Sequence, residues 1–120
     1  MKYLWTTIHV SDLNRSVAFY EEVAGLTLEN RFLTDSGSEI AFMKSEETGT
    51  KVELLRRGDF GGRKEDAALS LGFETDDLDG KREELKKRGY GVGDIISPNP
   101  KIRFFFVKDP DGIDIQLVEE

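Results

Sequence analysis

The sequence predicts an α+β fold built from two tandem modules, each with the element order strand, helix and three strands (βαβββ). The main observation is an internal repeat, in which helix-start and glycine landmarks of the first half return 63 to 65 residues later. The pairs are Asp12 and Asp77, Gly25 and Gly89, and Gly49 and Gly112. Because 120 residues suit one compact domain, we interpret residues 1–120 as a single domain in which repeats 1–56 and 67–120 are joined by a linker, 57–66.

The first repeat begins with an alternating segment, residues 3–10, that is rich in β-branched and aromatic side chains and predicts a strand. Ser11 and Asp12 follow as a helix-capping signal. The next apolar residues recur at helical spacing until Gly25 ends the helix, and they are Leu13, Val17, Tyr20 and Ala24. Three further strands are predicted between turn signals, at residues 26–33, 39–44 and 51–56.

The second repeat follows the same order. A strand at 67–75 precedes the capping pair Asp76-Asp77, and a very polar helix covers 78–88 and ends at Gly89. The last three strands are predicted at residues 92–97, 102–108 and 113–118. Between the final two, Pro110 presets φ for a turn and Gly112 takes the positive φ that other residues resist, which predicts a hairpin.

Composition excludes several classes of partner and site. Lys and Arg number 17 against 24 Asp and Glu, and no basic stripe is present, so nucleic acid and anionic membranes are not expected partners. The absence of cysteine excludes disulfides and thiolate chemistry and suits a reducing cytoplasm, where we expect the protein to be located. The first apolar run is too short for a signal peptide, and no segment is long enough to cross a bilayer.

The chain resembles the vicinal oxygen chelate superfamily, which includes glyoxalase I, bleomycin resistance proteins, fosfomycin resistance enzymes and extradiol dioxygenases. The resemblance is carried by VSDLNRSVAFYEEVAGL, by FETDDLDGKREELKKRGY and by DPDG before the last strand, while YLWTTIHVSD and KVELL are similar to the glyoxalase I branch. It implies curved mixed sheets around a small-molecule cavity and a homodimer. Fold alone does not settle activity.

In this family each module supplies one metal ligand from its first strand and one from its last. The resemblance places these ligands at Trp5, Glu53, Ser70 and Gln116, where the family usually has His, Glu, His and Glu. An indole has no lone pair to donate, and a neutral hydroxyl or amide ligates weakly. We therefore expect no metal cofactor, with a divalent ion such as Zn or Ni as the alternative.

Strand alternation predicts which side chains share the cavity. The first repeat contributes Trp5, Thr7, His9, Lys51, Glu53 and Leu55. The second contributes Ser70, Gly72, Glu74, Asp114 and Gln116, together with either Phe105 or the pair Phe104 and Phe106.

Each central cavity residue has two interpretations. Trp5 either stacks on a ring or a cation, or fills the volume that a metal once held. Glu53 is the candidate catalytic base, or else a carboxylate paired with Lys51 or hydrogen-bonded to Gln116 and Ser70.

The remaining polar residues also leave alternatives open. His9 either contacts the ligand, as a basic residue at its place does in glyoxalase I relatives, or is structural; it stands about 13 Å along the strand from Trp5, too far to replace it as a metal ligand. Glu74 and Asp114 either line the cavity or face solvent. The linker 57–66 is either a lid for an anion or a soluble loop.

Three functions follow from these residues. The first is metal-independent binding or sequestration of a small aromatic or cationic molecule, since Glu53, Glu74 and Asp114 outnumber Lys51 in the predicted cavity. The second is a metal-dependent isomerase of the lactoylglutathione lyase (glyoxalase I) type, which is the activity expected if the protein is an enzyme. The third is an interaction module without a ligand.

Overall fold

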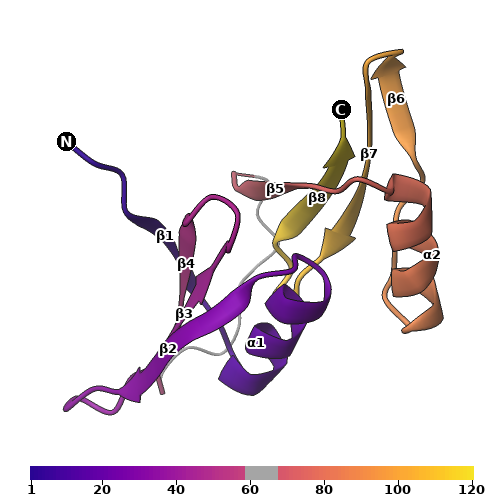
Figure 1. Cartoon of the computed structure of the whole chain (residues 1–120). Coiled ribbons are helices and arrows are strands. Elements are labelled where there is room, and N and C mark those ends of the chain that lie inside the picture. Colours follow the sequence, from indigo (N-terminus) through magenta and orange to yellow (C-terminus); the bar gives the residue numbers. More distant parts are fainter. Residues whose placement is uncertain (59–67) are drawn as a thin grey trace. The chain divides into compact units, whose positions relative to one another are not determined.

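The computed structural model describes residues 1–58 and 68–120, and the chain forms two compact units, Met1–Lys64 and Glu65–Glu120 (Figure 1). Each unit has the order strand, helix and three strands, with a four-stranded mixed sheet. The predicted α+β fold of two βαβββ modules is therefore confirmed. No helix among the described residues has the length and apolar character needed to cross a bilayer.

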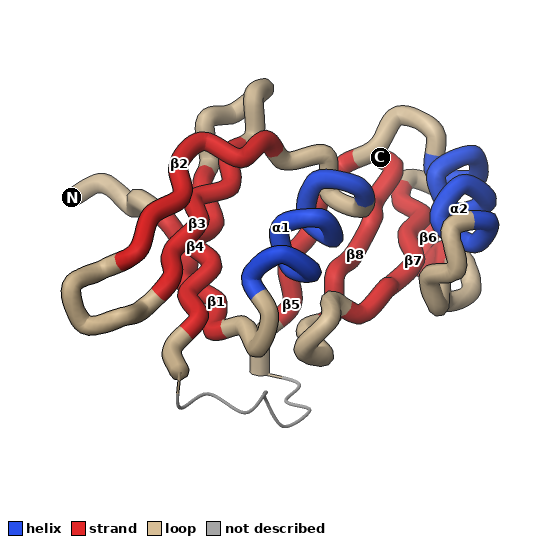
Figure 2. The backbone as a smooth tube through the Cα atoms, turned by 90° about the horizontal axis from the view of Figure 1, so that it is seen from below, coloured by secondary structure: helices blue, strands red, loops and turns tan. Residues whose placement is uncertain are grey.

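The first unit's sheet has the strand order β1-β4-β3-β2, with β1 parallel to β4 and the other pairs antiparallel (Figure 2). Its elements are β1 (Trp5–His9), α1 (Leu13–Glu22), β2 (Thr27–Leu33), β3 (Glu39–Lys44) and β4 (Lys51–Arg56). Helix α1 contacts β2, β3 and β4, so it covers one face of this sheet. The buried strand residues alternate along the chain and are Ile8, Ala41, Met43, Val52 and Leu54. The opposite face lies away from α1.

Helix α1 begins where predicted and ends at Glu22, two residues before the predicted stripe residue Ala24. The Asp12 side chain accepts a hydrogen bond from the backbone N–H of Arg15 at 3.1 Å, which satisfies one unpaired donor at the helix start. Gly25 adopts φ +67 just after the helix, and the N–H of Leu26 returns to the carbonyl of Tyr20 at 3.0 Å. The predicted stripe residues Leu13, Val17 and Tyr20 are all buried.

The second unit repeats this arrangement with the strand order β5-β8-β7-β6, and β5 is parallel to β8. Its elements are β5 (Ser70–Glu74), α2 (Leu78–Lys87), β6 (Ile96–Asn99), β7 (Ile102–Lys108) and β8 (Asp114–Glu119). Helix α2 contacts β7 and β8, and its buried residues are Leu78 and Leu85. Such a narrow apolar stripe contributes little burial, so other contacts must help to hold the helix.

Charged contacts at the start of α2 supply part of that support. Glu119 on β8 accepts a hydrogen bond from the backbone N–H of Leu78 at 3.0 Å. Arg103 on β7 lies between Asp79 and Glu119, with N–O distances of 2.6 and 3.2 Å. The Arg103 hydrogen bond lowers the pKa of Asp79, and the same contact raises the pKa of Arg103. Helix α2 is thereby tied to both neighbouring strands.

The strand predicted at 92–97 is wrong in its extent. Strand β6 begins only at Ile96, and Val92 makes an isolated bridge with Val107. Glycines flank Val92, and the N–H of Gly93 bonds the Phe106 carbonyl at 2.8 Å, where an added Cβ would lie 3.2 Å from that oxygen. Glycine weakens strand formation and permits this close approach of backbones, so the chain bends before β6 starts.

The predicted hairpin at the end of the chain is present. Gly112 adopts φ +95, and the Asp109 carboxylate accepts hydrogen bonds from the N–H groups of Asp111 and Ile113 at 2.9 and 2.8 Å. Strand β8 begins at Asp114, one residue later than predicted. Most of the predicted linker, from residue 59 onward, and the predicted strand start at Ala67 lie outside the described residues.

Candidate functional site

The face of the first unit that α1 leaves uncovered, here called the aromatic face, is organised around β4. In the register of β1 and β4, Trp5 pairs with Lys51, Thr7 with Glu53 and His9 with Leu55. All six of these side chains alternate with the buried residues that face α1, so they share one side of the sheet. Trp5, Thr7 and His9 are exposed, whereas the β4 residues are half-buried.

Three aromatic rings form a row across the aromatic face. The Trp5 ring meets Phe42 of β3 edge-on, with centroids 4.9 Å apart and planes at 78°. Phe42 in turn stacks on Phe32 of β2 at 6.4 Å and 24°. Since β4 lies between β1 and β3, the indole reaches across β4 to Phe42, whose register partner on β4 is Glu53. Sequence reasoning missed Phe32 and Phe42, although alternation along β3 was a signal for the second.

The charged groups on the aromatic face pair in a way that the sequence left open. Thr7 donates its hydroxyl hydrogen to Glu53 Oε1 at 2.5 Å. Lys51 instead binds Glu29, with 2.8 Å between Nζ and Oε1, and Lys44 lies 3.9 Å from the other Glu29 oxygen. The Lys51 hydrogen bond, assisted by the charges of Lys51 and Lys44, lowers the pKa of Glu29. Lys51 is therefore bonded to a carboxylate other than Glu53.

The acidic and basic side chains of the aromatic face balance. Glu29 and Glu53 are matched on the aromatic face by Lys44 and Lys51. The expectation of a cationic ligand rested on Glu53, Glu74 and Asp114 against Lys51, and two of these three acids, Glu74 and Asp114, belong to the second unit. For this face, charge alone no longer favours a cation.

The second unit has a corresponding uncovered face on β5, β8 and β7. Ser70 pairs with Asp114 and Gly72 with Gln116, while Glu74 is exposed at the end of β5. The Gln116 side-chain oxygen lies 3.7 Å from the position that a Cβ on Gly72 would take. Gly72 occupies the place that Thr7 has in the first repeat, so β5 offers Gln116 no hydroxyl there.

Phenylalanines on β7 complete this second face. Phe105 is fully buried, while Phe104 and Phe106 are half-buried and meet edge-on at 5.7 Å. The structure thus selects the Phe104 and Phe106 pair of the two predicted alternatives. Asp114 forms a 2.8 Å ion pair with Lys108, its register partner, and so does not simply face solvent.

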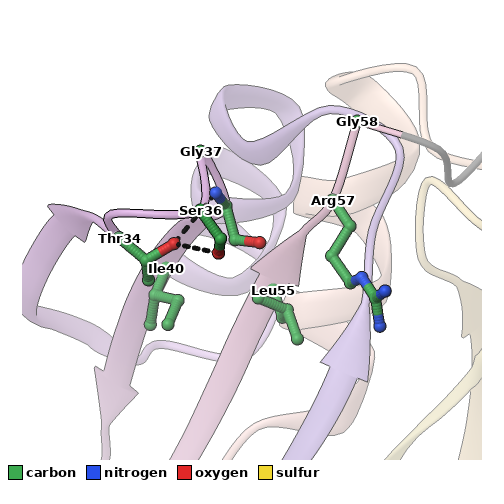
Figure 3. A pocket seen from close by; sticks show the side chains of 8 residues that line it. Thr34, Ser36, Gly37, Ile40, Leu55, Arg57 and Gly58 are labelled. Atoms are coloured by element: carbon green, nitrogen blue, oxygen red, sulfur yellow. Dashed lines mark hydrogen bonds between the residues drawn. The ribbon is translucent and has the colours of Figure 1, made fainter.

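A cavity of about 470 Å³ lies at one end of the aromatic face, between the β2–β3 hairpin and the end of β4 (Figure 3). We call it the hairpin cavity, and it is lined by Thr34, Ser36, Gly37, Ser38, Ile40, Leu55, Arg57 and Gly58. Ile40 and Leu55 are register partners on β3 and β4 and form its apolar part. Sequence reasoning missed its hydroxyl residues, because they belong to a turn with no periodic pattern.

The residues at the four positions that the resemblance assigns to the family's metal ligands do not fit a metal ion. Glu53 is the only good ligand among them, and it accepts a hydrogen bond from Thr7. The Trp5 indole has no lone pair and packs against Phe42, and Ser70 and Gln116 are weak neutral donors. Among residues 1–58 and 68–120 there is no group of three His, Asp or Glu side chains that could hold a metal ion.

Sequence comparisons identify similar proteins along nearly the whole chain. The profile of the Glyoxalase/Bleomycin resistance protein/Dioxygenase superfamily matches residues 2–117. The uncharacterized protein YwbC of Bacillus subtilis is 31% identical over 111 residues, covering 89% of this chain and 88% of YwbC. The lactoylglutathione lyase of Haemophilus influenzae is 28% identical over 128 residues, covering 99% of this chain and 93% of the lyase.

Solved structures show the same fold. Glyoxalase I of Leishmania major, described as trypanothione-dependent, superposes with a TM-score of 0.84 at 25% identity, covering all of this chain and 87% of that one. TnmS3, an antibiotic binding protein from a Streptomyces species, gives a TM-score of 0.75 at 25% identity, with coverage of 99% and 96%. Proteins similar to this chain thus include both an enzyme and a binding protein.

Proposed function

This chain belongs to the Glyoxalase/Bleomycin resistance protein/Dioxygenase superfamily, and we propose that it binds a small planar organic molecule on the aromatic face without a metal ion. The observation that carries the proposal is Trp5, which stands at a family metal position. Its ring packs on Phe42 and yet remains 38% exposed. A partly exposed indole supported by a second ring offers a flat surface on which another ring can stack.

Two further observations support binding rather than metal chemistry. The side chains of Trp5, Ser70 and Gln116 are poor ligands for a transition metal. TnmS3, which has the same fold, is described as an antibiotic binding protein. Glu53 and its Thr7 partner border the ring row and supply polar contacts for a bound molecule.

The test uses the single tryptophan of the chain as its own reporter. Planar aromatic fragments of one to three rings, each in cationic, neutral and anionic form, are titrated into the protein with and without EDTA. We expect quenching or a spectral shift of Trp5 emission and a raised melting temperature, because a ligand that binds only the folded state stabilises it. Neither effect should depend on EDTA.

A matched pair of variants locates the binding. Phe32 and Leu33 are adjacent, exposed apolar residues of β2, and their side chains lie on opposite faces of the sheet. Phe32→Ala should weaken binding of the fragments, whereas Leu33→Ala should not. The proposal is contradicted if the two substitutions weaken binding equally, or if none of the fragments binds.

Metal-dependent lactoylglutathione lyase activity is the second candidate, because Glu53 is retained and the Haemophilus lyase matches the chain almost end to end. Metal analysis of the purified protein, together with an assay for isomerisation of a methylglyoxal hemithioacetal, tests it. We expect no stoichiometric metal and no turnover above background. A tightly bound zinc or nickel ion with turnover would establish the enzyme and remove the metal-free proposal.

The assembly state is a separate part of the proposal. We infer a homodimer, as the resemblance to this superfamily implies, and sedimentation equilibrium tests it against a 13.6 kDa monomer.

A protein that neither binds fragments nor turns over the hemithioacetal would instead fit the third candidate, an interaction module without a ligand.

A further inference from the structure

We propose that the molecule bound on the aromatic face carries an oxyanion, a carboxylate or a phosphate, that enters the hairpin cavity and binds Arg57. The inference rests on the proposed function, since it assumes that a ring lies against Trp5 and Phe42. It goes further by assigning the ligand class, an aromatic acid. Three features of the hairpin cavity support it. Two are its hydrogen-bond donors and its cationic side chain (Figure 3). The third is its position beside the ring row, which follows from the register of β3 and β4.

Hydroxyl groups of the hairpin leave donors for a ligand. Thr34 Oγ1 accepts from the backbone N–H of Ser38 at 3.0 Å and shares a 3.0 Å hydrogen bond with Ser36 Oγ. The two hydroxyls of Thr34 and Ser36 have two hydrogens, and their mutual bond uses one. The other hydrogen remains to donate outward, and Ser38 also lines the cavity.

The described lining of the hairpin cavity includes one cationic side chain, that of Arg57. Arg57 is the one ionised side chain among the eight residues described as lining it, and none of the eight carries a carboxylate. A guanidinium presents five N–H donors in a planar fork that matches the geometry of a carboxylate or phosphate. Hydroxyl donors together with this cation make the cavity suited to an anionic acceptor.

The hairpin cavity adjoins the aromatic face along β3 and β4. Ile40 and Leu55 pair in its apolar part, and the next pair on the same side of β3 and β4 is Phe42 with Glu53. Two residues of strand correspond to about 7 Å, so a ring stacked on Phe42 lies roughly that far from the cavity. A molecule with an acid group one or two bonds beyond its ring system can place the ring on Phe42 and the acid group in the hairpin cavity. A lone inorganic anion is too small to reach both places.

Isothermal titration with matched probes tests the inference. The probes are 2-naphthylacetate, its neutral isostere 2-naphthylacetamide, and 2-naphthyl phosphate, which separates a carboxylate site from a phosphate site. We expect an acid to bind about tenfold or more tightly than the amide, because an oxyanion pairs with the Arg57 guanidinium through charge-assisted, bidentate hydrogen bonds, whereas the amide offers only a neutral acceptor. Added salt should reduce the preference.

Two arginine variants locate the preference. Arg57→Met should remove the preference for the acid, so that the acid and the amide bind with about equal affinity. Arg31→Met is the matched control. Arg31 pairs with Ala41, whose side chain is buried on the α1 side, and register partners share one face of a sheet. Arg31 therefore lies on the α1 side, opposite to the aromatic face. Arg31→Met should keep the full preference. Ser36→Ala should lower the preference for the acid, but by a smaller factor than Arg57→Met.

The outcomes separate this inference from the proposed function. If the wild-type protein binds acid and amide equally, or if Arg57→Met with an unchanged circular dichroism spectrum keeps the preference, the oxyanion assignment is wrong while aromatic binding stands. If neither the probes nor the earlier fragments bind, the proposed function fails and this inference fails with it.

Discussion

Replacing Trp5 with alanine tests how the aromatic face is built. The indole crosses β4 to reach Phe42, so its removal takes away a contact between β1 and β3, which are not adjacent in the sheet. Two roles were open for Trp5, filling space and contacting a ligand. Stability measurements address the first, and binding measurements address the second.

The expected loss can be worked from the burial of the side chain. Trp5 is 38% exposed, so roughly three fifths of its surface is removed from solvent. Aromatic side chains bury about 150–250 Å² when they are fully enclosed. Three fifths of that area at about 25 cal/mol per Å² is about 2–4 kcal/mol, and this value is an upper bound because the unfolded chain already buries some surface. We expect Trp5→Ala to lower the free energy of unfolding by about 2–3 kcal/mol.

Urea denaturation followed by circular dichroism at 222 nm is the assay, since the variant lacks the fluorescent reporter. Trp5→Phe should lose about 1 kcal/mol because it keeps a ring near Phe42. Tyr3→Ala is the control, because Tyr3 is 77% exposed and should change stability by less than about 0.5 kcal/mol. A Trp5→Ala effect no larger than that control would refute the packing of Trp5 across the sheet.

Three further predictions concern other parts of the chain. Ser16→Ala should raise the free energy of unfolding by about 1 kcal/mol in thermal or urea denaturation, because the buried hydroxyl of Ser16 has no hydrogen-bond partner within the described part of the structure. The pKa of Asp79 is lowered from 3.8 by Arg103, so this carboxylate stabilises the fold above its ordinary pKa and loses that contribution as pH falls through the folded value. Arg103→Met should therefore flatten the acid side of a plot of unfolding free energy against pH, and an unchanged slope would contradict the pairing. The double substitution Trp5→His with Ser70→His should increase zinc affinity measured by titration calorimetry, because it restores two imidazole donors; unchanged affinity would show that the missing donors are not what prevents metal binding.

Much of the fold could be predicted from the sequence because its signals are local. Asp12 and Asp77 cap helices through bonds to residues three positions later, and Gly112 takes a positive φ in its turn. Alternation along single strands also separated Trp5 and Thr7 from the buried Ile8. Where two glycines interrupted the pattern near Val92, the same reasoning misplaced the start of a strand.

The sequence by itself determined that two βαβββ modules repeat, because repeat spacing and periodicity can be read along the chain. It also determined that Trp5, Ser70 and Gln116, the residues at three positions that the resemblance assigns to metal ligands, are poor donors, because this is a property of the side chains themselves. Only the tertiary structure decided that Trp5 contacts Phe42, that Lys51 binds Glu29 and that Arg57 joins the hairpin hydroxyls around one cavity. These partners come from different strands and turns. Their contacts depend on strand order and register, which long-range pairing sets and no single segment encodes.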